Sequence, residues 1–401
     1  MTDFEKHYDR FIREEISRRR LLRRGAAGAL SVSALSYLAA CGSETGGAGG
    51  DGGGGGQQQA IKKGKVGSSM YMANWPLYIE EDRGTLEEFE QEYGAKVKYV
   101  EEINDNTEFF GKVRQQYERG DSGGRDIHVV TDWMAARMRR LGYVQKLDKS
   151  ELPNVSANLI ERLKSPPFDP RREYSVPWQS GFTGIVYRKD KVKREPRSVD
   201  DLFDPDYKGK VTMLTEMRDT VGVVAASMGF DPETASVDEF MQAVEKVGQG
   251  AESGQIRGFT GNEFTKDLPS GDSWLILGWS GDSVQLQADN PNIRFVAPET
   301  GVHLWTDNMQ VPVGAPEAFT AQKFMDFVYQ PEVQADIAEY VNYICPVDGV
   351  KEILTQRDPA IGENQLIFPN EETLSGGFIF RDLKPEEDQQ LTEEFQRVIG
   401  A

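Results

Sequence analysis

The sequence predicts an α/β protein whose sheets are largely parallel. From about residue 65 onward, apolar stretches with strand patterning alternate with stretches that carry helix start and stop signals. This alternation is typical of βα units, in which helices cover a parallel sheet. The chain has 401 residues, of which 38% are hydrophobic and 10% aromatic. That composition excludes disorder along the whole chain, and the length suits two lobes of about 100–200 residues each.

The expected elements follow one another from residue 66 to residue 340. Strands are expected at 66–73, 95–100, 126–130, 210–214, 273–279 and 293–297. Helices are expected at 85–94, 133–140, 216–228, 316–329 and 331–340. The first helix opens on the capping-box pattern Thr85-Leu86-Glu87-Glu88 and ends at Gly94. Gly142 lies just beyond the second helix, and Thr215 is the expected N-cap of the third.

Residues 1–40 have the pattern of an export signal. Ser-Arg-Arg-Arg-Leu-Leu-Arg at 17–23 precedes a run of small and apolar residues at 25–40, and Leu-Ala-Ala-Cys closes the segment at 38–41. The arginines resemble a twin-arginine signal, and the last four residues resemble a bacterial lipobox. The apolar run is shorter than the ~20 residues that span a bilayer. We therefore expect an exported protein whose Cys41 is lipidated and anchors it to the outer face of the cytoplasmic membrane.

Residues 41–61 are expected to form a flexible tether. They contain the run Gly52–Gly56 followed by three glutamines, and they have almost no apolar side chains. A tether of this length reaches about 25 Å, which would let a folded domain sit off the membrane surface.

The charge and the metal-binding residues exclude several classes of function. The formal net charge is −19, and the part beyond residue 40 is more acidic still because residues 1–40 carry a basic excess. Such a chain repels nucleic acid and favours cations. Three histidines (His7, His128 and His303) cannot build a zinc cluster, and the two cysteines, Cys41 and Cys345, cannot pair if Cys41 is lipidated. We expect no cofactor and no metal.

Aromatic and acidic residues recur just past the expected strand ends. Ligands of open α/β sheets bind outside the carboxyl ends of the strands. A crevice with aromatic walls and carboxylate ends suits ammonium groups, through cation–π attraction and charge-assisted hydrogen bonds. The recurring residues are Trp75 and Tyr78, Asp132 and Trp133, Glu216 and Asp219, Trp279 and Asp282, and Trp305 and Asp307.

Each of these residues also has a structural interpretation. A tryptophan at a strand end can belong to the core. Glu216 and Asp219 fall in the first turn of an expected helix, where acids stabilise the helix dipole, and Asp132 can cap the next helix. Asp307 can be a hinge aspartate that bonds only to backbone. The repetition over five segments is what favours a binding site.

Long stretches of the chain resemble the bacterial spermidine/putrescine-binding proteins of ABC importers. The resemblance covers about residues 67–397. Its best segments are Ala-Asn-Trp-Pro-Leu-Tyr-Ile at 73–79, residues 126–148 with Arg-Met-Arg-Arg-Leu-Gly-Tyr-Val-Gln-Lys-Leu-Asp at their end, 168–177, Asp-Tyr-Lys-Gly-Lys at 206–210, and Trp-Thr-Asp-Asn-Met at 305–309.

The resemblance implies a set of ligand-binding residues for a polyamine. Two positions depart from the family pattern: Leu77 stands where the family has an acid, and Arg381 lies near a family glutamine and would repel a cation if it pointed inward. The implied ligand-binding residues are Trp75, Tyr78, Thr131, Trp133, Glu216, Asp219, Trp279, Trp305, Asp307 and Tyr343.

The resemblance also implies a two-lobe periplasmic-binding-protein fold. Its lobes are expected at 62–180 with 307–350, and at 181–306 with 351–401. The chain would cross the hinge at Ser180-Gly181 and at Thr306-Asp307. Ligand bound between the lobes would favour closure, and the closed form of this monomer would dock on membrane permease subunits.

Two other functions remain open from the residues. The same scaffold can bind an anion or an iron complex, for which Arg218 and Arg381 are candidates. A secreted hydrolase can use Glu216 and Asp219 as acid and base, although catalytic carboxylates of glycosidases usually come from separate segments.

The lipobox generates a direct prediction. Cys41→Ala should abolish lipid attachment, so that the protein is released or left unprocessed, because the thiol is the acylated group. Mass spectrometry and membrane fractionation measure both effects, with Cys345→Ala as the control that keeps the lipid. Unchanged membrane association without any lipid on the parent protein would contradict the prediction.

Overall fold

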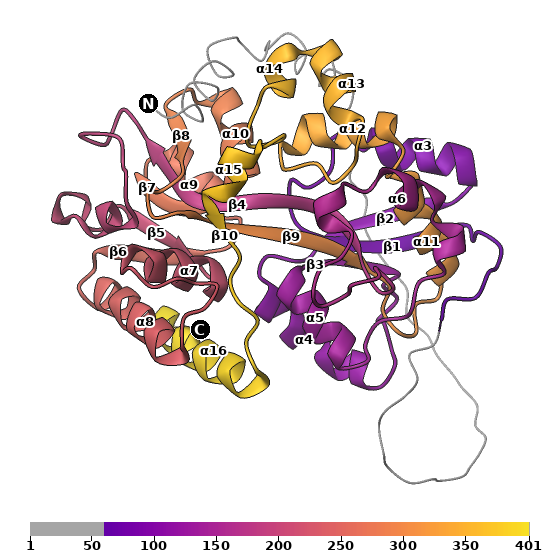
Figure 1. Cartoon of the computed structure of the whole chain (residues 1–401), viewed down its shortest axis with the longest axis horizontal. Helices are drawn as coiled ribbons and strands as arrows, with labels where there is room; N and C mark the ends of the chain where they lie inside the picture. The colour runs from indigo at the N-terminus through magenta and orange to yellow at the C-terminus, as the bar shows by residue number, and fades with distance from the viewer. Residues whose placement is uncertain (1–59, 401) are drawn as a thin grey trace, which may run out of the picture.

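One mixed sheet runs through the middle of the molecule and carries the chain from one half to the other (Figure 1). In the computed structural model, which describes residues 60–400, ten strands form this sheet. Their order is β2-β1-β3-β9-β4-β7-β5-β6, with β10 beside β9 and β8 beside β4.

The strands are short except for β4 and β9. They are β1 (Ser69–Asn74), β2 (Lys96–Glu101), β3 (Ile127–Thr131), β4 (Val176–Arg188), β5 (Val211–Leu214), β6 (Ile256–Thr260), β7 (Leu275–Trp279), β8 (Ile293–Val296), β9 (Val302–Gln310) and β10 (Gly377–Phe378).

Helices cover the sheet and close the ends of the molecule. They are α3 (Gly84–Tyr93), α4 (Asn106–Glu118), α5 (Asp132–Arg140), α6 (Pro153–Asn158), α7 (Met217–Ser227), α8 (Val237–Glu252), α9 (Phe264–Ser270), α10 (Ser280–Asp289), α11 (Ala318–Phe327), α12 (Pro331–Val341), α13 (Val350–Arg357), α14 (Pro359–Gly362), α15 (Glu371–Ser375) and α16 (Pro385–Ile399).

The strands divide into two groups, each with its own helices (Figure 1). We call the group β2-β1-β3, with α3, α4, α5 and α11, the first lobe. The group β7-β5-β6, with α7 to α10 and α16, is the second lobe. Strand pairs inside each group are parallel, as the alternation of strands and helices predicts.

The two long strands join the lobes and are antiparallel to each other. Ser180 of β4 lies opposite Thr306 of β9, and Gly181 lies opposite Trp305. Their pairings with β3 and β7 are antiparallel too, so the expectation of a largely parallel sheet fails at its centre. The physical reason is that the chain crosses the hinge outward in β4 and returns in β9. All of β4 except its last residue is buried.

The local expectations differ from the structure at two helix starts. α3 begins at Gly84 after Arg83, and the Thr85 hydroxyl donates to the Glu80 carboxylate instead of capping the helix, so the expected capping box is wrong. α7 begins at Met217 with Glu216 as its N-cap residue in place of Thr215. The expected strands are all present, with ends shifted by a few residues.

The folded part begins earlier than the expected tether boundary at residue 61. Ile61 is buried, and its amide donates to the Lys146 carbonyl at 2.8 Å. The expected signal, Cys41 and most of the tether lie outside the described residues. Among residues 60–400, no helix is long and apolar enough to cross a membrane.

The antiparallel pairing of β4 and β9 leaves no room for a side chain at Gly181. A Cβ atom there would lie 2.5 Å from Trp305 Cζ2 and 2.8 Å from Tyr343 Cδ1. Gly181→Ala should therefore displace both rings and lower the free energy of unfolding by about 1–3 kcal/mol.

Gly258→Ala is the matched control for this substitution, because nothing lies within 4 Å of a Cβ at Gly258 in β6. Denaturant unfolding measures both variants. Equal losses of stability in Gly181→Ala and Gly258→Ala would contradict the close packing around Gly181.

Candidate functional site

A cavity lies between the lobes, where the ends of β1, β3 and β7 meet β9. Both lobes contribute side chains to it, and apart from Pro76 the residues that line it are aromatic, acidic or small and polar. They are Trp75, Pro76, Tyr78, Asn106, Thr131, Glu216, Asp219, Asn262, Trp279, Asp282, Trp305, Asp307 and Tyr343.

All of the ligand-binding residues implied by the resemblance except Trp133 line this one cavity. Their chain positions run from residue 75 to residue 343, so the fold brings together groups that the sequence keeps far apart. Trp305 and Asp307 both face the cavity from β9, as the alternation of side chains along a strand requires for residues two apart.

Two of the tryptophans that line the cavity are held at their edges by hydrogen bonds to the protein. Trp75 Nε1 donates to the Val129 carbonyl at 3.0 Å, and its ring meets Trp279 edge to face at 5.8 Å between centroids. Trp305 Nε1 donates to Thr183 Oγ1 at 3.0 Å. With their polar atoms paired, these rings present apolar faces to the cavity.

Two tyrosines connect these walls to the acids. The rings of Tyr78 and Tyr343 meet edge to face at 5.2 Å between centroids, and Tyr343 lies 5.4 Å from Trp305. The Tyr78 hydroxyl donates to Asp307 and the Tyr343 hydroxyl donates to Asp282. Each tyrosine therefore orients one carboxylate.

Asp307 is fixed by side chains of the first lobe. Its Oδ2 accepts from the Tyr78 hydroxyl at 2.9 Å, and its Oδ1 accepts from Thr131 Oγ1 at 2.8 Å. The alternative of a hinge aspartate bonded only to backbone is therefore wrong. Burial raises the pKa of Asp307 to about 7, against the lowering effect of these two hydrogen bonds.

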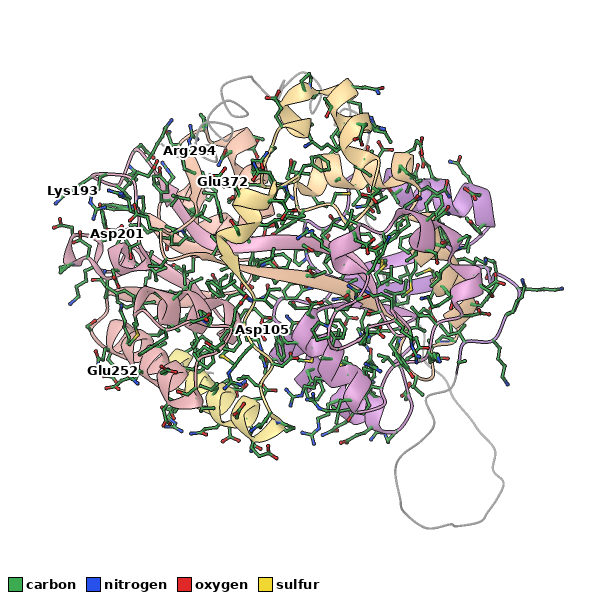
Figure 2. The ribbon with its side chains drawn as sticks, in the orientation of Figure 1. Asp105, Lys193, Asp201, Glu252, Arg294 and Glu372 are labelled. Atoms are coloured by element: carbon green, nitrogen blue, oxygen red, sulfur yellow. The ribbon has the colours of Figure 1, made fainter. Side chains whose placement is uncertain are left out.

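Glu216 reaches across the cleft to the first lobe. Its Oε1 accepts from Asn106 N at 2.5 Å and from Asn106 Nδ2 at 2.7 Å. The adjacent Asp105 lies near the centre of the view in Figure 2, and its carboxylate caps α4 through Thr107 N at 2.7 Å. Burial, together with the charges of Asp105 and Asp219, raises the pKa of Glu216 well above its usual range.

Asp219 contacts side chains of the two hinge strands, β4 and β9. Its Oδ1 accepts from the Thr183 hydroxyl and lies 3.1 Å from His303 Nδ1. Glu216 makes no capping bond to α7. Helix-dipole stabilisation alone therefore does not describe these two acids.

Asp282 adds a fourth carboxylate from the start of α10. Its Oδ2 accepts from the Tyr343 hydroxyl at 2.8 Å and from Asn262 Nδ2 at 3.4 Å. Burial raises the pKa of Asp282 to about 7. Asn262 is only 8% exposed, and its Oδ1 has no hydrogen-bond partner, so this end of the cavity has an acceptor without a donor.

Within the described range 60–400, no lysine, arginine or histidine lines the cavity. Arg218 points away from it and pairs with Asp388 at 2.8 Å. Arg381 also points away, since its guanidinium pairs with Glu387 at 2.9 Å and bonds to the Ala235 carbonyl. Among residues 60–400, no group of three or more His, Cys, Asp or Glu side chains is arranged to hold a metal ion.

Three further residues singled out in the sequence lie outside the cavity. Trp133 packs against Arg218, with the guanidinium 3.7 Å from the ring centroid, and lines a separate hollow. Asp132 accepts from Asn308 Nδ2 at 2.6 Å within the first lobe. Leu77 adopts a positive φ of 57° in the loop after β1.

Asn106 and Asn262 line the cavity but were not expected from the sequence. Asn106 is the first residue of α4, Asn262 lies two residues past β6, which was not predicted as a strand, and neither residue is aromatic or acidic. The signal that could have found Asn106 is Asp105-Asn106, a helix N-cap directly after a strand-and-loop segment, where open α/β sheets present their binding residues.

Comparison with known proteins identifies relatives over most of the folded part. Residues 85–363 match the family described as bacterial extracellular solute-binding protein. The chain is 28% identical over 314 residues to the spermidine/putrescine-binding periplasmic protein of Escherichia coli, covering 77% of this chain and 86% of that protein. It is 25% identical over 351 residues to the putrescine/agmatine-binding protein of Pseudomonas aeruginosa, with coverage of 82% and 92%.

A solved structure shares the architecture. The putative spermidine/putrescine ABC transporter from Listeria monocytogenes superposes with a TM-score of 0.74 at 25% identity, over 83% of this chain and 99% of that one.

The buried acids make the stability of the protein depend on pH. Because the pKa of Asp282 is raised to about 7 in the fold, the folded state binds more protons than the unfolded state between about pH 4 and 7. The stability contribution of Asp282 therefore falls as pH rises through that window, by roughly 2–4 kcal/mol.

Urea unfolding of the parent protein and of Asp282→Asn from about pH 4 to 8 measures this contribution. The parent should lose stability relative to the variant as pH rises. Parallel curves would show that Asp282 titrates normally in the fold.

Proposed function

Because the chain belongs to the bacterial extracellular solute-binding proteins, which share a two-lobe periplasmic-binding-protein fold, we propose that its solute is a polyamine of the putrescine or spermidine kind. The polyamine is captured between the lobes and delivered to the permease of an ABC importer. The relatives in Escherichia coli and Pseudomonas aeruginosa, whose names state spermidine, putrescine or agmatine binding, support this ligand class.

The observation that carries the proposal is four buried carboxylates around one cavity with no basic side chain among its lining residues. Burying a carboxylate without a counter-charge is costly, and burial accordingly raises the pKa of Asp282 and Asp307 to about 7. An organic cation with two or more ammonium groups supplies the missing charges and donors. An anion would add to the repulsion, so the anion alternative has no support in this cavity.

The cavity offers two groups of acceptors to such a cation. Asp307, Glu216 and Asp219 surround one region of the cavity. The charge of Asp219 helps to raise the pKa of Glu216 and the pKa of Asp307. Asp282 and the unpaired Asn262 Oδ1 form the other region, and no other carboxylate contributes to the raised pKa of Asp282. We propose that these regions take different ammonium groups.

The aromatic residues are proposed to pack along the alkyl chain between the ammonium groups. Their faces attract cations, by about 0.5–2 kcal/mol per contact, and exclude water. The proposed ligand-binding set is Trp75, Tyr78, Thr131, Glu216, Asp219, Trp279, Asp282, Trp305, Asp307 and Tyr343. Trp133 is left out because its ring packs against Arg218.

The proposal includes the location and the closure of the protein. Export by the signal at 1–40 and lipidation at Cys41 would hold this binding protein at the outer face of the cytoplasmic membrane, as a monomer. The lobes would move about Ser180-Gly181 and Thr306-Asp307, which lie opposite each other in β4 and β9. Polyamine bound to both lobes would favour the closed form that the permease engages.

Calorimetric titration tests the proposed ligand class. Putrescine, spermidine and spermine are titrated beside citrate and ferric citrate. At least one amine should bind in the micromolar range or tighter, and the anions should not bind. Binding of citrate or ferric citrate without binding of any amine would overturn the proposal.

Asp307→Asn should weaken binding of the best amine by about 2–5 kcal/mol, which is roughly 30- to several-thousand-fold. The substitution keeps the shape and removes the charge that faces the ammonium group. Titration with the same amine measures the loss.

Asp326→Asn is the matched control, because Asp326 on α11 is a buried carboxylate of the first lobe whose pKa is raised by burial, but it bonds to the amides of Asn154 and Val155 outside the cavity. Its affinity should stay within about threefold of the parent. A change of less than threefold in Asp307→Asn, with the fold intact, would remove Asp307 from the site.

A further inference from the structure

A second contact between the lobes lies outside the cavity and is built around Arg218. Trp133 on α5 belongs to the first lobe and Arg218 on α7 belongs to the second. The Arg218 guanidinium covers the Trp133 ring at 3.7 Å from its centroid. Because the two side chains lie on opposite sides of the cleft, this cation–π contact exists only when the lobes are together.

The C-terminal helix extends the contact. Asp388 on α16 accepts from Arg218 Nη2 through Oδ1 at 2.8 Å, and its Oδ2 lies 3.6 Å from Nη1 of Arg137 on α5. The Arg137 guanidinium also lies 4.2 Å from the ring centroid of Phe110 on α4. Asp388 therefore stands between a cation of each lobe.

The segment that carries Asp388 is attached to the second lobe. After β10 the chain runs down between the two lobes to α16, which packs on α8 (Figure 1). Arg381 fastens this segment by pairing with Glu387 at 2.9 Å and bonding to the Ala235 carbonyl. When the lobes separate, Asp388 should stay with Arg218 and leave Arg137.

We infer that Trp133, Arg137, Arg218 and Asp388 form an interlobe latch that stabilises the closed form without touching the ligand. Contacts that exist only in the closed form raise its population, and they slow the release of whatever the cavity holds. The latch also accounts for Trp133, which has an aromatic ring at a strand end but no place in the cavity.

Burial makes this latch sensitive to the loss of one partner. Arg218 is 5% exposed and Asp388 is 6% exposed. Truncating one member of a buried ion pair leaves the other charge unpaired, which costs more than the pair itself contributes. Opening the lobes would return water to that charge, so a damaged latch should favour the open form.

The latch is tested with putrescine as the probe, and the inference rests on the proposed function only through that probe. Trp133→Leu should weaken putrescine binding by about 3- to 30-fold, mainly through faster dissociation, because the cation–π contact is lost from the closed form alone. Trp133→Phe retains a ring and should recover most of the affinity. The radius of gyration of amine-free Trp133→Leu should exceed that of the parent protein.

Trp274→Leu is the matched control. Trp274 makes a cation–π contact with Lys210, at 5.5 Å, inside the second lobe, so its loss should not alter closure. If Trp133→Leu fails to fold, Asp388→Asn replaces it, with the same expected weakening and expansion.

The outcomes separate the latch from the proposed function. An affinity and a radius of gyration equal to those of the parent, or an affinity loss equal to that of Trp274→Leu, would overturn the latch. If the parent protein binds no amine, the proposed function fails, and the radius of gyration alone decides on the latch: expansion of Trp133→Leu supports it and no expansion overturns it.

Discussion

The arrangement of the cleft is governed by buried negative charge that no basic side chain of its lining compensates. Glu216, Asp219, Asp282 and Asp307 face one cavity, and all four are buried. Carboxylates in such a place either take up protons or recruit cations. Their hydrogen-bond donors include hydroxyls and amides, which orient the carboxylates but carry no formal charge. The cavity is therefore selective for ligands that bring positive charge with them.

The hinge strands make this arrangement possible. β9 supplies Trp305 and Asp307 to the cavity, and β4 supplies the hydroxyl of Thr183 that orients both Trp305 and Asp219. Because the two strands belong to both lobes, rotation of the lobes changes the cavity without breaking the sheet. Glu216 bonds to Asn106 across the cleft, and the interlobe latch lies beside it, so closure and charge burial proceed together.

The sequence predicts most of the structural features that are encoded by short or repeated residue patterns. The α/β alternation, the helix end at Gly94 and the site residues in the segment 75–78 and in β9 follow from patterns of a few residues. β4 was not expected as a strand, because it is buried along almost its whole length and has no alternating pattern. The Thr85 hydroxyl could not be assigned locally, since its partner Glu80 lies in a loop whose path depends on tertiary contacts.

Side-chain direction is the part of the site that the sequence could not decide. Trp133 follows a strand end as Trp279 does, yet Arg218 of the other lobe holds its ring outside the cavity. Arg381 could have pointed at the ligand, and its bonds to Ala235 and Glu387 turn it away. Asn262 enters the cavity from the loop after β6, a strand that was not predicted from the sequence. Each of these outcomes depends on contacts between segments more than 80 residues apart or on the local path of a loop.

Proton release on ligand binding is a direct measure of whether the buried carboxyls of the cleft ionise when a cation arrives. Putrescine is titrated calorimetrically at about pH 6.5 in two buffers of different ionisation enthalpy, and the difference in apparent enthalpy gives the number of protons exchanged. The ammonium groups of the ligand stay charged at that pH, so any exchanged proton comes from the protein. With the pKa values of Asp282 and Asp307 raised to about 7 by burial, the approach of ammonium groups should ionise these carboxyls and release protons. Binding without proton exchange, or with proton uptake, would contradict a cleft built on buried carboxylates that await a cation.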